Sequence, residues 1–231
     1  RVIGVEDAMA DNSKPKDAVP LFLVTGASGF VGSAMVRLLH ARGVRTRILL
    51  RNPEKAPQFE SQAILAPAAS PTVFQTEVVK GDLLDAESLN RAVQGVTGVY
   101  HIAAVYRETT ISDELFFKVN AEGVRSLFEA ACKAGVSRIV HCSTGGVLGD
   151  IKGAPGSDLS PYAPEDVYQE SKVEGEKIAL EFFRSGQIRG AVIRPGMIYG
   201  PGDTRFLKLF RALARGRFAH VGSSNQWVHY V

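Results

Sequence analysis

The segment TGASGFVG at residues 25–32 limits what this chain can fold into more than any other feature. It places Gly26, Gly29 and Gly32 between an apolar run, residues 21–24, and a stretch with apolar residues at helical spacing. A glycine inside an ordinary strand or helix costs stability, because glycine loses the most conformational freedom on folding. The pattern therefore predicts a tight turn from a strand into a helix, where the backbone must stay bare.

Strand-like and helix-like patterns alternate from this turn onward, with short breakers between them. Strands are expected over residues 21–24, 44–50, 77–82, 98–104, 136–143 and 188–195. Helices are expected over residues 29–41, 86–93, 113–135, 164–186 and 204–216, with Gly135 ending the third of them. Such alternation is typical of βαβ units. The sequence therefore predicts an α/β fold, a doubly wound parallel sheet covered by helices on both faces.

The composition excludes several classes of protein. Hydrophobic residues make up 45% of the 231 residues and charged residues 22%, as in an ordinary globular domain. The net charge of +3 is too small to indicate a nucleic-acid or membrane partner, and no apolar run is long enough to span a bilayer. Cys132 and Cys142 have no CxxC spacing and no metal-ligand company. A reducing compartment, the cytoplasm, and no metal are expected, while one disulfide stays open.

The ends of the chain and one internal stretch depart from the alternating pattern. Residues 1–18 mix both signs of charge without the apolar region of a signal peptide, so a disordered tail is expected there. Residues 56–72 hold three prolines and are expected to form a surface insertion. The chain opens on Arg1, Met9 resembles a natural start, and Val231 falls within a strand-like pattern. We therefore expect a fragment of a longer protein.

The glycine turn indicates a phosphate-binding site. In a doubly wound fold the first strand-to-helix turn lets a phosphate lie against backbone N–H groups, where the helix N-terminus adds partial positive charge. Gly26 would allow the turn, Gly29 the close approach, and Gly32 the contact between helix and sheet. This placement predicts a Rossmann fold that binds a dinucleotide, with a ligand-free turn as the alternative. The same predicted cofactor site includes the residues between the glycines: Ser28, Phe30 and Val31.

The residue that ends the second expected strand indicates which dinucleotide binds. An acid there binds the ribose hydroxyls of NAD, and a basic residue favours the 2′-phosphate of NADP. This chain has Arg51 at that place, with Arg47 on the same strand and Lys55 after it. The sequence therefore favours NADP. NAD stays open, because Arg51 could instead stack on the adenine or face solvent.

A bound nicotinamide implies hydride transfer, which needs a group to move the matching proton. A tyrosine can do so when a cation lowers its pKa, and a lysine four residues later on a helix lies on the same face. Of the six tyrosines only Tyr168, in YQESK, has such a lysine, Lys172. This pair is the predicted acid/base, and a solvated helix face is the alternative.

Seven motifs follow one another in order: TGASGFVG, GDLLD, HIAA, VNAEG, CSTGGVLG, YQESK and RPGMIYGPGD. Together they resemble the extended short-chain dehydrogenase/reductase superfamily, and within it the NAD(P)-dependent epimerase/dehydratase group. The resemblance covers about residues 20–231. It implies an NAD(P)-binding Rossmann domain over residues 19–199 and the beginning of a smaller, incomplete substrate-binding region over residues 200–231.

The resemblance also implies roles for individual residues. Asp82 and Leu83 would hold the adenine, and Ala103 and Ala104 would line the cofactor cleft. Pro195 and the residues after it would border the nicotinamide.

A third catalytic hydroxyl is implied five residues before the glycine of a VYG-like element. Counting back from Gly149 gives Thr144, with Ser143 as the close alternative. This hydroxyl would bind the substrate oxygen, and Lys172 would also hydrogen-bond the nicotinamide ribose. The chain departs from the family pattern in two places: Leu148 replaces the usual aromatic residue, and the acid after the second strand is absent. The second departure weighs against NAD.

Two histidines and a serine offer other chemistries. His101 is expected to pack at the end of a strand beside the cofactor rather than act as a base. His141 is expected to be a core histidine whose ring is satisfied by hydrogen bonds. A hydrolase would need Ser143 in a G-x-S-x-G elbow, but HCSTG lacks the first glycine.

The expected helix over residues 204–216 is amphipathic. Its basic positions are Arg205, Lys208, Arg211 (or Ala212) and Arg215, and its apolar ones are Phe206, Leu209, Phe210 and Leu213. The cations form either a solvated face or a contact with the diphosphate of a nucleotide-sugar substrate.

These features predict an epimerase/dehydratase-type oxidoreductase that acts on a small molecule, with a nucleoside-diphosphate sugar as the favoured substrate. A reductase or dehydrogenase of the dihydroflavonol-reductase or 3β-hydroxysteroid type shares every motif and is the runner-up. A non-catalytic NADP-binding sensor or scaffold is the alternative of another class, and the intact Tyr168–Lys172 pair weighs against it. The resemblance further implies a homodimer formed by the long helices over residues 112–134 and 163–185.

Overall fold

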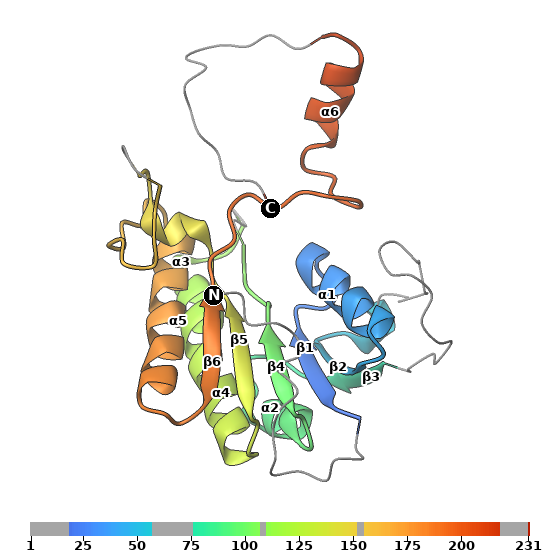
Figure 1. The fold of residues 1–231 in the computed structure, drawn as a ribbon, viewed down its shortest axis with the longest axis vertical. Helices are drawn as coiled ribbons and strands as arrows, with labels where there is room; N and C mark the ends of the chain where they lie inside the picture. The colour runs from blue at the N-terminus through green and yellow to red at the C-terminus, as the bar shows by residue number, and fades with distance from the viewer. Residues whose placement is uncertain (1–18, 57–75, 107–109, 152–154, 218–230) are drawn as a thin grey trace.

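The computed structural model describes residues 19–56, 76–106, 110–151, 155–217 and 231. The expected tail, residues 1–18, and the expected insertion beyond residue 56 lie outside the described residues. A six-stranded sheet forms the centre of the described structure (Figure 1). Its strands are β1 (Leu21–Thr25), β2 (Arg45–Leu50), β3 (Glu77–Lys80), β4 (Gly98–His101), β5 (Arg138–Cys142) and β6 (Arg189–Ile193). Each of the six was expected from the sequence.

The strands pair in parallel in the order β3-β2-β1-β4-β5-β6. The order reverses between β1 and β4, which are neighbours although two strands separate them in the chain. In open parallel sheets ligands bind beyond the carboxyl ends of the strands at such a reversal. The predicted doubly wound fold is confirmed, and it places the ends of β1 and β4 side by side.

Helices cover both faces of the sheet. They are α1 (Phe30–Ala41), α2 (Ala86–Val93), α3 (Asp113–Phe117), the π-helical η2 (Lys118–Glu122), α4 (Gly123–Lys133), α5 (Val167–Arg184) and α6 (Leu207–Ala214), with short 3₁₀ turns η1 (Pro53–Lys55) and η3 (Gly145–Leu148). Side chains alternate between the faces of a strand. In β1, Phe22 and Val24 therefore pack in the core under α1, while Leu21 and Leu23 join the larger core under α2, α4 and α5.

Two helices differ in detail from the expectation. The helix expected over residues 113–135 is one helical run whose middle turn, η2, is π-helical, and Gly135 follows its end with a φ of +68°. The helix expected from residue 164 begins instead at Val167, because the side chain of Asp166 accepts a hydrogen bond from the N–H of Gln169 and caps it. Both adjustments fall beside residues of the site described below.

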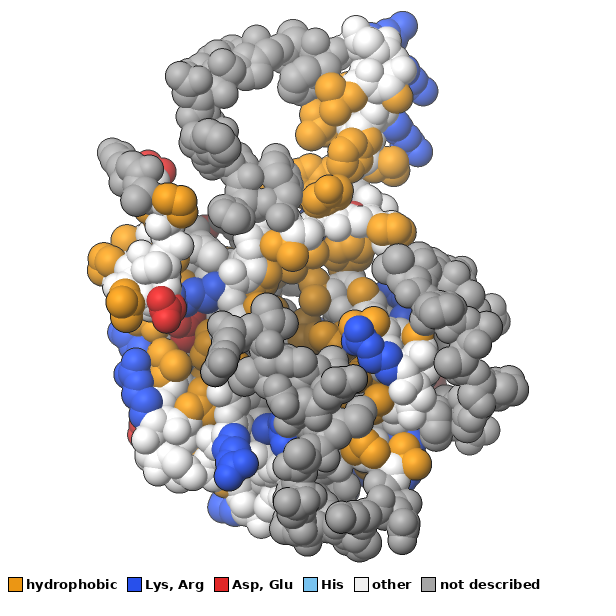
Figure 2. Space-filling model, viewed as in Figure 1, with side chains coloured by type: hydrophobic (Ala, Val, Ile, Leu, Met, Phe, Trp, Pro, Cys, Tyr) orange, Lys and Arg blue, Asp and Glu red, His pale blue; other side chains and the backbone are white. Residues whose placement is uncertain are grey.

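The C-terminal helix α6 stands apart from the sheet (Figure 1). It has no buried residue, and Leu207, Phe210 and Leu213 are exposed. Figure 2 shows hydrophobic side chains on this helix and along the segment leading to it, with Lys and Arg on its other side. The predicted amphipathic helix is confirmed, although Arg205 precedes its first residue. Within the described parts of the chain, none of the helices is long and apolar enough to cross a membrane.

Candidate active site

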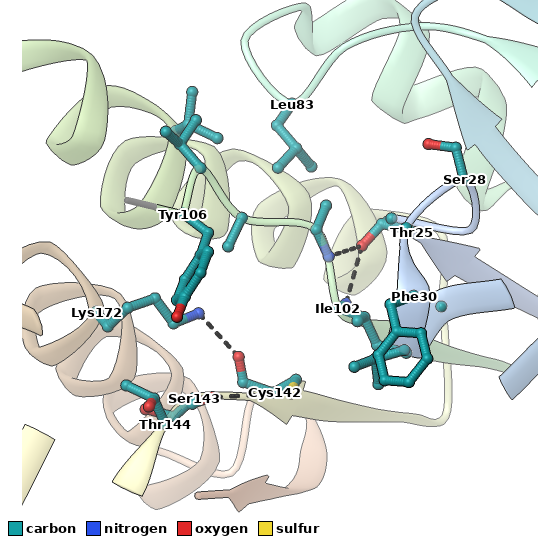
Figure 3. A pocket seen from close by; sticks show the side chains of 18 of the residues that line it. Thr25, Ser28, Phe30, Leu83, Ile102, Tyr106, Cys142, Ser143, Thr144 and Lys172 are labelled. Atoms are coloured by element: carbon teal, nitrogen blue, oxygen red, sulfur yellow. Dashed lines mark hydrogen bonds between the residues drawn. The ribbon is translucent and has the colours of Figure 1, made fainter. Parts of the chain in front are cut away.

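A cavity of about 640 Å³ lies at the carboxyl ends of the strands (Figure 3). Every residue that the sequence placed in the cofactor site or the catalytic group lines it: Gly26, Ser28, Gly29, Phe30, Val31, Gly32, Arg51, Asp82, Leu83, Ala103, Ala104, Thr144, Tyr168, Lys172 and Pro195. The fold thus brings together residues spread over 170 positions of the sequence, and their individual roles remain predictions. Among the described residues, no group of three or more His, Cys, Asp or Glu side chains is placed to hold a metal ion.

In the turn between β1 and α1, the backbone packs too closely for side chains at Gly26 and Gly32. Gly26 has a φ of +74°, and a Cβ atom there would lie 2.7 Å from the backbone nitrogen of Ala103. A Cβ on Gly32 would lie 2.1 Å from the carbonyl oxygen of Gly26. Gly29 precedes α1 and supplies no side-chain cap, so the first N–H groups of the helix are left for another acceptor. The turn therefore fits the pyrophosphate of a dinucleotide.

Thr25 and His101 join the ends of β1 and β4. The Thr25 hydroxyl accepts hydrogen bonds from the N–H groups of Ile102 and Ala103, each 3.1 Å long (Figure 3). It also lies 2.8 Å from Nδ1 of His101. With its acceptor positions used, the hydroxyl donates to Nδ1, so the ring carries its proton on Nε2. Burial lowers the pKa of His101 to about 3. The prediction that His101 packs beside the cleft is confirmed, and a neutral, tied ring is a poor base.

His141 lies next to His101 in the core of the sheet. Its side chain is fully buried, and the two imidazole rings are 5.2 Å apart. Burial holds the pKa of His141 well below its ordinary value. The prediction of a core histidine is confirmed, but the expectation that its ring would be hydrogen-bonded is wrong, because neither ring nitrogen has a hydrogen-bond partner among the described residues.

Two basic residues of the second strand and its end, Arg47 and Arg51, have different surroundings, and only Arg51 lines the cavity. Arg47 pairs with Glu77 and donates to the carbonyl oxygens of Ala92 and Gln94 at the end of α2, so its charge has a structural use. Arg51 lines the cavity and, with Lys80, an adjoining hollow. Sequence reasoning missed Lys80, because only the pairing of Leu50 with Lys80 between β2 and β3 brings it beside Arg51.

Lys172 is buried in the wall of the cavity. Its ammonium nitrogen donates a 2.8 Å hydrogen bond to the carbonyl oxygen of Cys142 (Figure 3). Burial lowers its pKa from 10.5 to about 8, an effect that the nearby Cys142 and Glu176 partly oppose. A buried lysine with one carbonyl partner retains N–H donors, and the cavity is where they can be used.

Tyr168 lies in the first turn of α5, one turn before Lys172. The ring of Tyr106, from the segment after β4, meets the Tyr168 ring edge to face at 5.0 Å. Tyr106 lines the same cavity and was missed from the sequence, because nothing in its neighbourhood marks it as close to residue 168. The ring contact fixes the orientation of Tyr168 at the cavity wall.

Thr144 and Ser143 were the two candidates for the third hydroxyl. Ser143 is buried and donates a 2.5 Å hydrogen bond to Glu176. The Thr144 hydroxyl accepts from the N–H of Gly146 and keeps its own hydrogen for another acceptor. Both residues line the cavity, but the geometry favours Thr144 as the group that binds a substrate oxygen.

Asn120 is a further residue that the sequence did not single out. The π-helical turn η2 buries its side chain, which bonds the N–H and C=O of Val105 at 2.8 and 3.0 Å and the Ser171 hydroxyl at 2.9 Å. A Cβ on Gly175 of α5 would lie 2.0 Å from the Asn120 carbonyl oxygen, so η2 and α5 are in close contact. Asn120 thereby fastens the segment that carries Tyr106 to the helix that carries Tyr168.

Of the basic residues predicted for the C-terminal helix, Arg205, which precedes α6, lines the cavity. Arg205 lines it with its guanidinium 5.7 Å from the centre of the Phe30 ring. That guanidinium is already paired with Asp203 at 2.9 Å and donates to the carbonyl oxygen of Ile198. Lys208, Arg211 and Arg215 are exposed, as a solvated basic face requires.

The chain matches the model of the NAD dependent epimerase/dehydratase family over residues 22–231. The protein belongs to this family. The resemblance seen in the sequence motifs is therefore confirmed.

Curated relatives carry several activities. The chain is 34% identical over 204 residues to a 3β-hydroxysteroid dehydrogenase/Δ5→4-isomerase of Mycobacterium tuberculosis, covering 84% of this chain and 51% of the relative. It is 33% identical over 215 residues to a ceramide reductase of Caulobacter vibrioides, covering 93% and 58%. It is 32% identical over 190 residues to a dTDP-glucose 4,6-dehydratase of Streptomyces niveus, covering 78% of this chain and 54% of the relative. The chain spans about half the length of the curated relatives it matches.

Solved structures show the same fold. The dTDP-glucose 4,6-dehydratase DesIV of Streptomyces venezuelae, with NAD and TYD bound, matches with a TM-score of 0.70 and 28% identity, covering 85% of this chain and 62% of that one. The UDP-glucose 4-epimerase of Thermus thermophilus in complex with NAD matches with a TM-score of 0.65 and 30% identity, covering 79% and 57%.

The buried Lys172 gives a testable dependence of stability on pH. Its pKa is about 8 in the folded protein against 10.5 ordinarily, so the unfolded state holds more protons between these values. Stability contributed by this site therefore rises as pH rises from about 8 to 10.5. We expect Lys172→Met to raise the free energy of unfolding by about 3 kcal/mol at pH 7, with the gain shrinking toward pH 10.

Urea denaturation at both pH values measures this difference. Lys177→Met is the matched control, because Lys177 is exposed on the same helix, where its ammonium forms a surface ion pair with Glu174 and lies 6.0 Å from the centre of the Tyr162 ring. A Lys172→Met effect of the same size at pH 7 and pH 10 would contradict the assignment.

Proposed function

We propose that this protein is an NAD(P)-dependent oxidoreductase for a hydroxyl- or carbonyl-bearing carbon of a small molecule. The observation that carries the proposal is the convergence of Tyr168, Lys172 and Thr144 on the cavity that also contains the glycine turn. A nicotinamide cofactor, when bound, supplies or accepts the hydride.

The chain's own residues handle the oxygen and its proton. Thr144 donates its hydroxyl hydrogen to the substrate oxygen and holds it in place. Tyr168 gives a proton to that oxygen when a carbonyl is reduced and takes it back when an alcohol is oxidised. The Lys172 ammonium, one helical turn away, stabilises the phenolate that Tyr168 becomes after giving up its proton.

The cofactor follows the edge of the sheet in this proposal. Its pyrophosphate lies against the Gly26–Gly32 turn, and its adenine against Asp82 and Leu83. Arg51, with Lys80 beside it, gives the preference for NADP over NAD, since both lysine and arginine pair well with a phosphate. Residues 19–199 would form the cofactor domain, and residues 200–231 would begin the substrate-binding region.

The lining of the cavity favours an apolar substrate. Besides Tyr106, it is formed by Leu115 of α3, Val119 of η2, and Met197 and Ile198 after β6. Met197 and Tyr106 are 40% and 49% exposed, so a bound apolar molecule would remove their surface from water. We therefore place a ketone or secondary alcohol on an apolar skeleton first, the chemistry named for the relatives that act on 3β-hydroxysteroids and ceramide.

A nucleoside-diphosphate sugar is the second candidate substrate. It is supported by the solved relatives with NAD and nucleotide ligands and by the guanidinium of Arg205 in the cavity. Against it, Arg205 would have to leave Asp203 to pair with a diphosphate. From the family resemblance we further propose a homodimer formed through α3–α4 and α5. From the free thiols of Cys132 and Cys142 we propose a cytoplasmic location.

Cofactor consumption separates the two substrate classes. A reductase oxidises one NADPH for each ketone reduced, whereas an epimerase regenerates its cofactor within each turnover. We expect loss of NADPH absorbance with a panel of 3-ketosteroids and apolar aryl ketones, and none with UDP-glucose or dTDP-glucose. Sugar epimerisation without net NADPH loss would favour the second candidate instead.

The Tyr168→Phe variant tests the acid/base. Removing one hydroxyl leaves the cavity intact, so NADPH should bind as before, while turnover falls by on the order of 10²- to 10⁴-fold. Fluorescence titration gives the affinity and the absorbance assay gives the rate. Tyr100→Phe is the control, because Tyr100 packs against Phe22 in the core. Wild-type turnover in Tyr168→Phe would exclude Tyr168 as the proton donor.

The Arg51→Asp variant tests the cofactor preference. Loss of one charge-assisted bond to the 2′-phosphate should weaken NADPH binding by about 10- to 100-fold and leave NADH binding unchanged or stronger. Calorimetric titration with both dinucleotides measures this, and Arg42→Asp at the exposed end of α1 is the control. Equal affinities of the wild-type protein for NADPH and NADH would contradict the NADP preference.

A further inference from the structure

A buried carboxylate, Glu176, lies two turns after Tyr168 and one turn after Lys172 on α5. It is 1% exposed and accepts hydrogen bonds from three side chains. The donors are the Ser143 hydroxyl at 2.5 Å, the Tyr162 hydroxyl at 2.9 Å, and the Arg194 guanidinium at 2.5 Å from Nη2 and 2.9 Å from Nε. Both carboxylate oxygens are used, so the group is held rigidly.

Two of the donors, Ser143 and Arg194, lie next to residues of the site. Ser143 follows β5 and precedes Thr144, and Arg194 follows β6 and precedes Pro195. The two segments are also joined through the backbone: Ser143 donates to the carbonyl oxygen of Ile193 at 2.8 Å, and Gly145 to that of Pro195 at 2.7 Å. Glu176 ties both of them to α5, the helix of Tyr168 and Lys172.

The negative charge of Glu176 is balanced by the positive charge of Arg194. Burial raises the pKa of the Glu176 carboxyl, but the hydrogen bonds from Arg194, Ser143 and Tyr162 outweigh it and hold that pKa below its ordinary value. The ion pair with Glu176 raises the pKa of Arg194 in turn. Glu176 is therefore an anion throughout the working pH range, one turn from the buried ammonium of Lys172.

Other titratable groups near Lys172 carry little charge at neutral pH. His101 and His141 approach it from β4 and β5, and burial keeps both rings neutral. Burial raises the pKa of the Cys142 thiol, which also faces Lys172. Of the described groups that face Lys172, Glu176 is the one that supplies negative charge at pH 7.

We propose that Glu176 is a positioning residue of this active site. Its carboxylate locks the Thr144 segment and the Pro195 segment to α5, and its negative charge lies one helical turn from the Lys172 ammonium. The proposal rests on the oxidoreductase function proposed above and adds to it a residue that touches neither substrate nor cofactor.

A purely structural node would behave differently. Replacing a structural buried anion leaves Arg194 unpaired and lowers stability, but the molecules that remain folded would turn over at the wild-type rate and with the wild-type pH profile. A positioning node changes the rate of the folded protein, because a small misplacement of the reacting groups is costly.

The Glu176→Gln variant keeps the shape and one acceptor oxygen, but it removes the charge and turns the other acceptor, used by Ser143 or Tyr162, into an NH₂ donor. We expect kcat per folded molecule to fall by on the order of 10- to 100-fold while the Kd for NADPH changes by less than about threefold. In the pH–rate profile of ketone reduction, the fall in kcat at alkaline pH should begin at lower pH. The reason is that losing a nearby negative charge lowers the pKa of both Tyr168 and Lys172. Glu181→Gln, on the same helix as Glu176, removes a surface ion pair with Arg125 of α4 and should change none of these values.

Two further variants guard against simple unfolding. Glu176→Asp keeps the charge and should retain the wild-type pH limb even where kcat falls. Ser143→Ala removes one of the three donors and leaves the Glu176–Arg194 pair, so it should fold, and kcat should fall with an unchanged pH limb.

The outcomes separate this proposal from the proposed function. If the wild-type protein reduced no substrate, the oxidoreductase assignment would fail. The effect of Glu176→Gln on the titration of Lys172 could still be followed in the unliganded protein, by measuring the free energy of unfolding from pH 7 to pH 10. A Glu176→Gln protein with lowered thermal stability but unchanged kcat and pH limb would overturn the positioning role.

Discussion

The site depends on the close approach of two backbone segments at the ends of neighbouring strands. Thr25 closes β1 and holds the N–H groups of Ile102 and Ala103 at the end of β4, and its hydroxyl donates to the buried His101. This joint brings Ala103 so close to Gly26 that no side chain fits between them. The bare turn that results leads directly into α1 and leaves its N-terminus open. Gly26 is required by this contact, and Gly32 by its own approach to the carbonyl oxygen of Gly26.

A second constraint lies on α5. The helix presents Tyr168 and Lys172 to the cavity from successive turns, and Glu176 follows one turn later. Placing a lysine there lowers stability, because burial disfavours its charge. The fold accepts this penalty beside a carboxylate that is held by three donors. A buried ionisable group that does not improve the stability of the fold is most simply explained by a role in catalysis.

Much of this could be predicted from local sequence. The order and type of the strands and helices follow from hydrophobic periodicity, and Gly135 and the YQESK spacing mark local geometry that a short stretch of chain determines. The residues that were missed depend on contacts between distant segments. Lys80 reaches Arg51 only through the pairing of β2 with β3, and Asn120 turns inward only because η2 adopts a π-helical turn. Arg47 looked like a cofactor ligand until its bonds to Glu77 and α2 were visible.

The central claim is that a pyridine dinucleotide lies across the carboxyl edge of the sheet. A crystal structure of the protein grown with NADP⁺ tests it most directly. The account predicts the pyrophosphate against the N–H groups at the start of α1 and the nicotinamide between Pro195 and Tyr168. Dinucleotide density at another place on the protein, with the turn at Gly26 empty, would contradict it.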